Sequence, residues 1–102
     1  MTRRYAARAD ANQPQIVSAL RRAGATVTAT HAAGQGFPDL VVGYQGNNFL
    51  LEVKDGSKPP SERQLTPDQR DWHRDWRGQK AVVCNIAQAM AACGIELKGV
   101  KA

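Results

Sequence analysis

The feature that most constrains the fold is a pair of apolar runs separated by a short turn signal. Residues 40–44 and 49–53 are rich in β-branched and aromatic side chains, and Gly46 and Asn47 lie between them. This pattern is typical of two antiparallel strands joined by a tight turn. We therefore predict a β-hairpin whose loop is either Gly46-Asn47 or the four residues 45–48.

The loop determines which residues face one another across the hairpin. With either loop, Tyr44 pairs with Phe49, and Asp39 then lies opposite Lys54. Opposed residues share a face of the sheet, and Glu52 shares that face with Lys54 because side chains alternate along a strand. We therefore expect two carboxylates and one amine to converge at one end of the hairpin. A β-bulge or an odd-numbered loop would turn Asp39 to the other face.

A solvated strand end is the alternative interpretation of these charges, since single charged residues are usually exposed. However, Glu52 and Lys54 alternate with Val53 in an otherwise apolar strand. Burying a charge there is costly unless the charge has a partner. The pattern therefore favours a functional cluster.

Length and charge narrow the class of protein. A chain of 102 residues suits a single domain, residues 1–102, with a modest core. Its 14 Lys and Arg residues outnumber its 9 Asp and Glu residues, which favours polyanionic partners such as nucleic acid. Arg3 and Arg4 belong to a basic N-terminal arm, residues 1–10, that either contacts phosphate or is simply solvated.

Cysteine usage and hydropathy indicate the compartment. Cys84 and Cys93 lie in apolar contexts, which predicts reduced thiols and no disulfide. No apolar run is long enough to span a membrane, and the first residues lack the apolar segment of a secretory signal. We therefore expect a cytoplasmic protein with no membrane partner.

Two elements are expected before the hairpin. Apolar residues recur at helical spacing between Pro14 and Gly24, and Asn12 or Gln13 can cap this helix. Residues 25–30 alternate around a valine and predict a short strand.

Two loops flank the hairpin. Residues 31–36 are rich in Gly and Ala, so this loop either lets a phosphodiester approach its backbone or is merely flexible. Residues 55–65 form a long polar loop that contains two prolines, Lys58 and Arg63. Long loops in compact domains are often functional, so this loop is a candidate clamp for a substrate backbone.

The second helix has a strong start signal. Thr66 suits the N-cap, Pro67 the first helical position, and Gln69 completes a capping box. The capping box accounts for Gln69 without an active site, so both interpretations of this residue stay open.

The rest of this helix carries two rows of side chains. Arg70 and Arg74 form one row, which is either solvated or a track for phosphates. Trp72 and Trp76 form an apolar row, and we predict that they pack in the core rather than stack on bases.

A buried strand within residues 80–85 and a helix over residues 86–93 complete the elements. The order is helix, three strands, helix, strand, helix, and the second helix crosses over so that the last strand lies parallel to the third. The expected fold class is α/β, with a mixed four-stranded sheet flanked by helices.

Three motifs on these elements resemble the PD-(D/E)XK nuclease superfamily. They are Pro38-Asp39, Glu52-Val53-Lys54 and the segment 65–72, and together they look more narrowly like the VRR-NUC group, which is related to Holliday-junction resolvases. The resemblance spans roughly residues 12–90. It implies a restriction-endonuclease-like core and a nuclease that cleaves DNA in a bacterial or phage-infected cell, with branched and single-strand-containing DNA as candidate substrates.

The resemblance also implies roles for particular residues. Asp39 and Glu52 would ligate Mg²⁺ or Mn²⁺ with help from the Val53 carbonyl, Lys54 would orient or deprotonate the attacking water, and Gln69 would border the site. Oxygen ligands are those that hard divalent cations prefer. The basic side chains expected to contact nucleic acid are Arg3, Arg4, Lys58, Arg63, Arg70 and Arg74.

One departure from the family pattern matters. Related nucleases usually carry a Glu on the first helix, but no acid occurs here between Asp10 and Asp39, and Gln13 or Gln15 stands near the expected position. Low activity, a single metal and participation of Asp10 are the open alternatives. So are a catalytically weak or inactive nucleic-acid-binding protein on the same fold, a protein-interaction module, and a homodimer with two facing sites.

Overall fold

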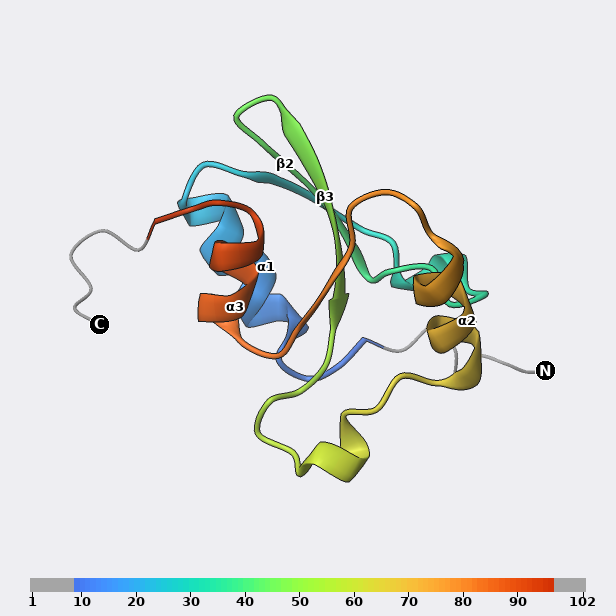
Figure 1. Cartoon of the computed structure of the whole chain (residues 1–102). Coiled ribbons are helices and arrows are strands. Elements are labelled where there is room, and N and C mark those ends of the chain that lie inside the picture. The colour runs from blue at the N-terminus through green and yellow to red at the C-terminus, as the bar shows by residue number, and fades with distance from the viewer. Residues whose placement is uncertain (1–8, 97–102) are drawn as a thin grey trace.

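The computed structural model describes residues 9–96 as one sheet with helices on both faces (Figure 1). The helices and strands are α1 (Gln13–Arg22), β1 (Thr26–Ala29), β2 (Leu40–Tyr44), β3 (Asn47–Val53), α2 (Pro67–Asp75), β4 (Ala81–Val83) and α3 (Ile86–Ala92). Two 3-10 turns, η2 (His31–Ala33) and η3 (Pro60–Glu62), lie in the two predicted loops. The predicted order of elements is confirmed.

The sheet is mixed, as predicted. Its strand order is β1-β2-β3-β4, with β1 and β2 antiparallel, β2 and β3 antiparallel, and β3 and β4 parallel. Helices α1 and α3 cover one face, and α2 lies on the other (Figure 1). The two faces of the sheet are therefore covered by different helices.

The predicted hairpin register is wrong by two residues. Tyr44 pairs with Asn47 rather than with Phe49, because the loop is Gln45-Gly46. Both loop residues have positive φ, 51° for Gln45 and 83° for Gly46, as the favoured two-residue hairpin turn requires. A shift of two residues leaves every side chain on its predicted face, because side chains alternate with a period of two.

The core lies between the sheet and the pair α1 and α3. Leu40, Val42, Leu51 and Val53 alternate onto this face and are almost fully buried. The helices and remaining strands complete the cluster with Ile16, Ala19, Leu20, Ala25, Val27, Val83, Ala89, Met90, Cys93 and Ile95. Hydrophobic burial thus fixes which face of β2 and β3 is turned to the core, and the alternate residues of both strands project toward α2.

Helix α2 begins as predicted but packs differently. The capping box is present, with the Thr66 side chain accepting from the Gln69 backbone and the Gln69 side chain accepting from the Thr66 backbone. The prediction that Trp72 and Trp76 lie in the core is wrong, since His73 is the buried residue of α2 and Trp76 is 39% exposed. The reason is that this face of the sheet carries Glu52 and Lys54 and offers little apolar surface to the two indoles.

Strand β4 is an edge strand, so the prediction of a buried strand is only partly correct. Val83 is buried in the core, whereas Val82 is exposed. Both cysteines are free thiols, as predicted, and burial raises the pKa of Cys93 to about 11. Among residues 9–96, no helix combines the length and apolar character that crossing a bilayer would need.

Candidate active site

Asp39 and Glu52 lie side by side at the open end of the β2–β3 hairpin, away from its turn. Asp39 directly precedes β2, and its backbone N–H donates at 3.0 Å to the carbonyl of Leu51, the residue that pairs with Leu40. The Val53 N–H donates to Asp39 Oδ2 at 2.8 Å. The predicted partner of Asp39 was Lys54. The corrected register instead brings the two acids together, with the Asp39 carboxylate fixed by the neighbouring backbone.

Glu52 is a buried acid with one unused oxygen. Its side chain is 1% exposed, Oε2 accepts a 2.9 Å hydrogen bond from Gln69 Nε2, and Oε1 is buried without a donor among the described residues. Burial and then the adjacent Asp39 carboxyl raise the pKa of Glu52 to about 9, against the opposing effect of Lys54. Without a bound cation, Glu52 therefore holds a proton at neutral pH, and the contact between the two carboxyls is favourable only with that proton.

Gln69 connects the start of α2 to Glu52 in β3 and to Lys54, which directly follows β3. Its Oε1 accepts from Lys54 Nζ at 2.8 Å and from the Thr66 N–H at 2.9 Å, while its Nε2 donates to Glu52. An ammonium can only donate, so the amide oxygen must face Lys54 and the amide nitrogen must face Glu52. One side chain therefore completes the capping box and also borders the site, which reconciles the two interpretations of Gln69.

Asp10 lies close enough to this cluster to interact with it electrostatically. Burial raises the pKa of the half-buried Asp10, Lys54 opposes this effect, and Asp39 reinforces it. The Asp10 carbonyl accepts a 3.0 Å hydrogen bond from the Gln13 N–H, which ties the residue to the start of α1. The sequence placed Asp10 in a basic arm and left its participation open. The sequence signal for this position is an acid shortly before the first helix.

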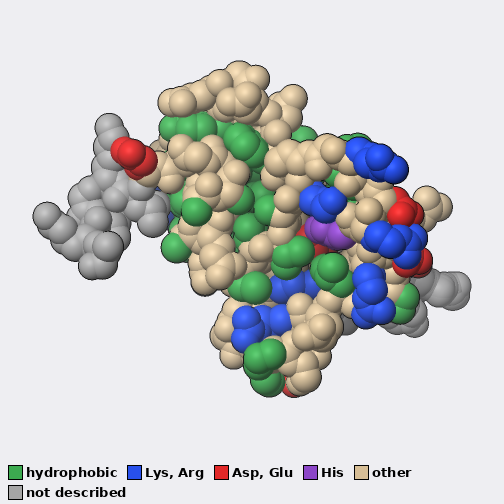
Figure 2. Space-filling view, in the orientation of Figure 1, with side chains coloured by type: hydrophobic (Ala, Val, Ile, Leu, Met, Phe, Trp, Pro, Cys, Tyr) green, Lys and Arg blue, Asp and Glu red, His purple; other side chains and the backbone are tan. Residues whose placement is uncertain are grey.

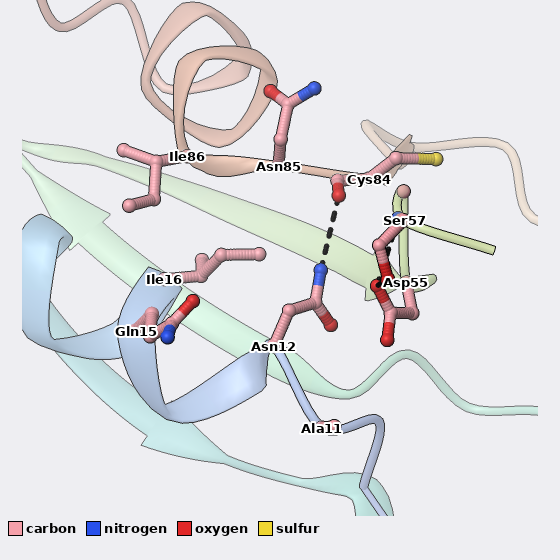
Figure 3. A pocket seen from close by; sticks show the side chains of 10 residues that line it. Ala11, Asn12, Gln15, Ile16, Asp55, Ser57, Cys84, Asn85 and Ile86 are labelled. Carbon is pink, nitrogen blue, oxygen red and sulfur yellow. Dashed lines mark hydrogen bonds between the residues drawn. The ribbon is translucent and has the colours of Figure 1, made fainter.

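The side chain of Asn12 anchors α1 to the strand ends instead of capping the helix. It occupies the N-cap position without a side-chain cap hydrogen bond. Its amide donates to the carbonyls of Lys54 at 3.1 Å and Cys84 at 3.0 Å. Asn12 and Cys84 both line a cavity of about 450 Å³ (Figure 3). This contact holds the beginning of α1, and therefore Asp10, near the end of β3.

A smaller cavity of about 150 Å³ opens beside Asp39 and Gln69. Its other walls come from His31, the loop 34–37 and the first turn of α2. Gly36, at φ 80°, packs against that turn so closely that an added Cβ would lie 2.2 Å from the Asp68 carbonyl oxygen. The glycine is therefore needed for helix packing, and the predicted close approach of a phosphodiester does not apply at Gly36.

The basic residues predicted to contact nucleic acid differ in how they are held. Arg3 and Arg4 lie outside the described residues, and Lys58 is exposed. The other three make contacts within the chain: Arg63 donates to the Lys58 carbonyl, Arg70 to the Leu65 carbonyl, and Arg74 to Asp71 and Asp75. Figure 2 shows Lys and Arg side chains gathered on the α2 side of the molecule.

The donor set for a metal is small. Residues 9–96 contain no group of three or more His, Cys, Asp or Glu side chains arranged to hold an ion. Asp39 and Glu52 supply two carboxylates, and the Val53 carbonyl points to the same side of β3 as the Val53 N–H that binds Asp39. Two carboxylates with substrate oxygens suffice for Mg²⁺, and the unpartnered Glu52 Oε1 is an oxygen that a cation would satisfy.

The comparisons with known proteins bear on the fold. No family model matches the chain, and no curated protein matches it. A solved structure of a VRR_NUC domain superimposes with a TM-score of 0.58 at 24% identity, covering 80% of this chain and 89% of the domain. The chain therefore has the fold of a VRR_NUC domain, the group that its motifs resemble.

Proposed function

We propose that this protein is a divalent-metal-dependent nuclease that hydrolyses DNA phosphodiester bonds. The observation that carries the proposal is the pairing of Asp39 with the buried, half-satisfied carboxyl of Glu52, next to Lys54. Burying two acids together destabilises a domain unless a ligand recovers the cost. A bound cation would offset this cost by neutralising the two carboxylates, and it would in turn attract a phosphate.

Asp39, Glu52 and the Val53 carbonyl are the groups that would hold Mg²⁺ or Mn²⁺. When bound, the ion neutralises charge on the scissile phosphate and on the leaving oxygen. Glu52 must first give its proton to solvent, because only the carboxylate is a ligand. The Val53 N–H binds Asp39 Oδ2 and thereby fixes the orientation of the Asp39 carboxylate beside Glu52.

Lys54 is the proposed partner of the attacking water. Its ammonium spends one N–H on Gln69 Oε1, which leaves two donors for water or a phosphate oxygen. Gln69 is a positioning residue, because it touches Lys54 and Glu52 and reaches the substrate only through them. Asp10 is a candidate third acid in place of the missing first-helix Glu.

The experiment is a cleavage assay on plasmid DNA and on a branched DNA, with Mg²⁺, Mn²⁺ or EDTA. Wild type is expected to cleave only with metal, and Asp39→Asn, Glu52→Gln and Lys54→Ala are each expected to lose cleavage. Asp75→Asn is the matched control, since Asp75 is an exposed acid on α2 that pairs with Arg74. Equal cleavage by wild type and the three site variants would refute the proposal.

A catalytically silent DNA-binding protein on the same fold is the second candidate. Within residues 9–96, no third acid joins Asp39 and Glu52 in a metal-binding group, and this favours the second candidate. Salt-dependent DNA binding by wild type, without cleavage in any metal, would support this alternative over the nuclease.

A further inference from the structure

Three aromatic rings form a row that leads from the site to solvent. Phe37 meets Trp72 edge-on with ring centroids 5.5 Å apart, and Trp72 stacks on Trp76 at 4.7 Å with an interplanar angle of 16°. Trp76 is 39% exposed and lies outside the core cluster. We call Phe37, Trp72 and Trp76 the aromatic row.

The outer ring of the row is held in one orientation. Trp76 Nε1 donates to the Gln79 carbonyl at 3.1 Å, and Lys80 Nζ donates to the Trp76 carbonyl at 2.8 Å. Gly78 passes so close that an added Cβ would lie 2.9 Å from Trp76 Nε1. Because the polar atom of the indole already has its partner, the exposed part of the side chain is apolar ring surface.

The surroundings of Trp76 are basic rather than apolar. Between residues 70 and 80, Arg70, Arg74, Arg77 and Lys80 outnumber the two acids Asp71 and Asp75. The same region carries the Lys and Arg side chains visible in Figure 2. An exposed ring among cations matches a nucleic acid, whose bases stack while its phosphates meet the charges.

The aromatic row is placed to act on the strand held at the site. Trp76 follows Gln69 by seven residues, which corresponds to about 10 Å along a helix axis at 1.5 Å per residue. About three stacked nucleotides span that distance at 3.4 Å each. A strand whose phosphate lies between Asp39 and Glu52 can therefore present a nearby base to Trp76.

We propose that Trp76 is a stacking platform for an unpaired base of the bound DNA. This inference rests on the proposed nuclease function and assigns it a base-binding residue. Bases within a duplex are already stacked and paired, and their faces are not available to an indole at the side of the helix. Stacking favours single strands without specifying their sequence.

The test compares two fluorescent strands of equal length, one of thymidines and one of abasic residues, by anisotropy in EDTA. Both carry the same phosphates, so their difference in affinity isolates the bases. Wild type should bind the thymidine strand about 5- to 150-fold more tightly, the ratio that corresponds to one stacked base. Trp76→Ala should lose this preference, and Trp76→Phe should keep most of it.

Ile86→Ala is the matched control, because Ile86 is 38% exposed and belongs to α3 rather than to the aromatic row. Equal binding of both strands by wild type, or a preference that survives in Trp76→Ala, would overturn the inference. Circular dichroism verifies that each variant is folded. Metal-dependent plasmid cleavage by wild type is scored separately. Wild type that cleaves but shows no base preference rejects only the platform, and wild type that shows the preference but does not cleave rejects only the nuclease.

Discussion

Gln69 Nε2 donates a 2.9 Å hydrogen bond to Glu52 Oε2, while Glu52 Oε1 is buried without a donor. This relationship makes Glu52 an acid that is positioned by its neighbour and still open to a ligand. Its raised pKa, about 9, follows from burial beside Asp39. Binding of a cation at this carboxyl must therefore be coupled to loss of a proton.

The first prediction concerns this coupling. Binding of Mn²⁺ or Mg²⁺ at pH 7 should release about one proton, because the ligand is a carboxylate and Glu52 is protonated without the ion. Metal affinity should rise as pH rises toward 9. Calorimetric titration in buffers of different ionisation enthalpy measures the released protons. Glu52→Gln should release none, and binding that is independent of pH in wild type would contradict the assignment.

The second prediction concerns stability without metal. Between the ordinary pKa of Glu52, 4.5, and its folded value of about 9, the folded state binds more protons than the unfolded state. Stability should therefore fall as pH rises through this window. Glu52→Gln removes the ionisation, and the variant should melt about 4–8 °C higher than wild type at pH 8, the shift that one kcal/mol gives in a domain of this size.

Thermal denaturation at pH 6 and pH 8 in EDTA tests this expectation. The gain should be larger at pH 8, where wild type pays more to keep Glu52 protonated. The exposed acid Glu62 provides the control, since Glu62→Gln should leave the melting temperature unchanged at both values. A Glu52→Gln variant that is less stable at pH 8 would mean that the charged carboxylate is satisfied without metal.

The third prediction separates the two roles of Gln69. Thr66→Ala removes the cap and should lower stability by about 1 kcal/mol while activity persists. Gln69→Ala removes the cap and the contacts to Lys54 and Glu52, so it should also reduce cleavage about 10- to 100-fold, the range typical of residues that orient a site. Melting curves and cleavage rates measured on both variants distinguish the roles. Equal cleavage rates would assign Gln69 to capping alone.

The hairpin shows how much of the site can be predicted from sequence. The loop was placed one position too far along, which moved the register by two residues and paired Asp39 with the wrong partner. The faces were nevertheless correct, because side-chain direction depends only on parity. Asp39, Glu52 and Lys54 therefore belong to one face in both descriptions, whereas the contact between the two acids required the actual register.

The two tryptophans show where sequence reasoning lacked information. Helical spacing put Trp72 and Trp76 on one side of α2, and apolar residues on one side usually face a core. The helix instead covers the end of the sheet that carries Glu52 and Lys54, and this depends on the crossover between β3 and β4. Helical periodicity shows which side chains share one face of a helix, but tertiary packing determines what that face contacts.

The last prediction concerns Asp10. Its place near the site depends on tertiary contacts that the sequence does not reveal, among them the hydrogen bonds from Asn12 to the carbonyls of Lys54 and Cys84. If Asp10 is a third acid, Asp10→Asn should weaken metal binding and reduce cleavage about tenfold, as loss of an outer ligand does. Glu62→Gln is the control, because Glu62 is an exposed acid in the loop between β3 and α2. Metal titration and cleavage rates should then fall for Asp10→Asn alone. Wild-type behaviour in both assays would leave Asp39 and Glu52 as the complete set of acids and would favour a single metal position.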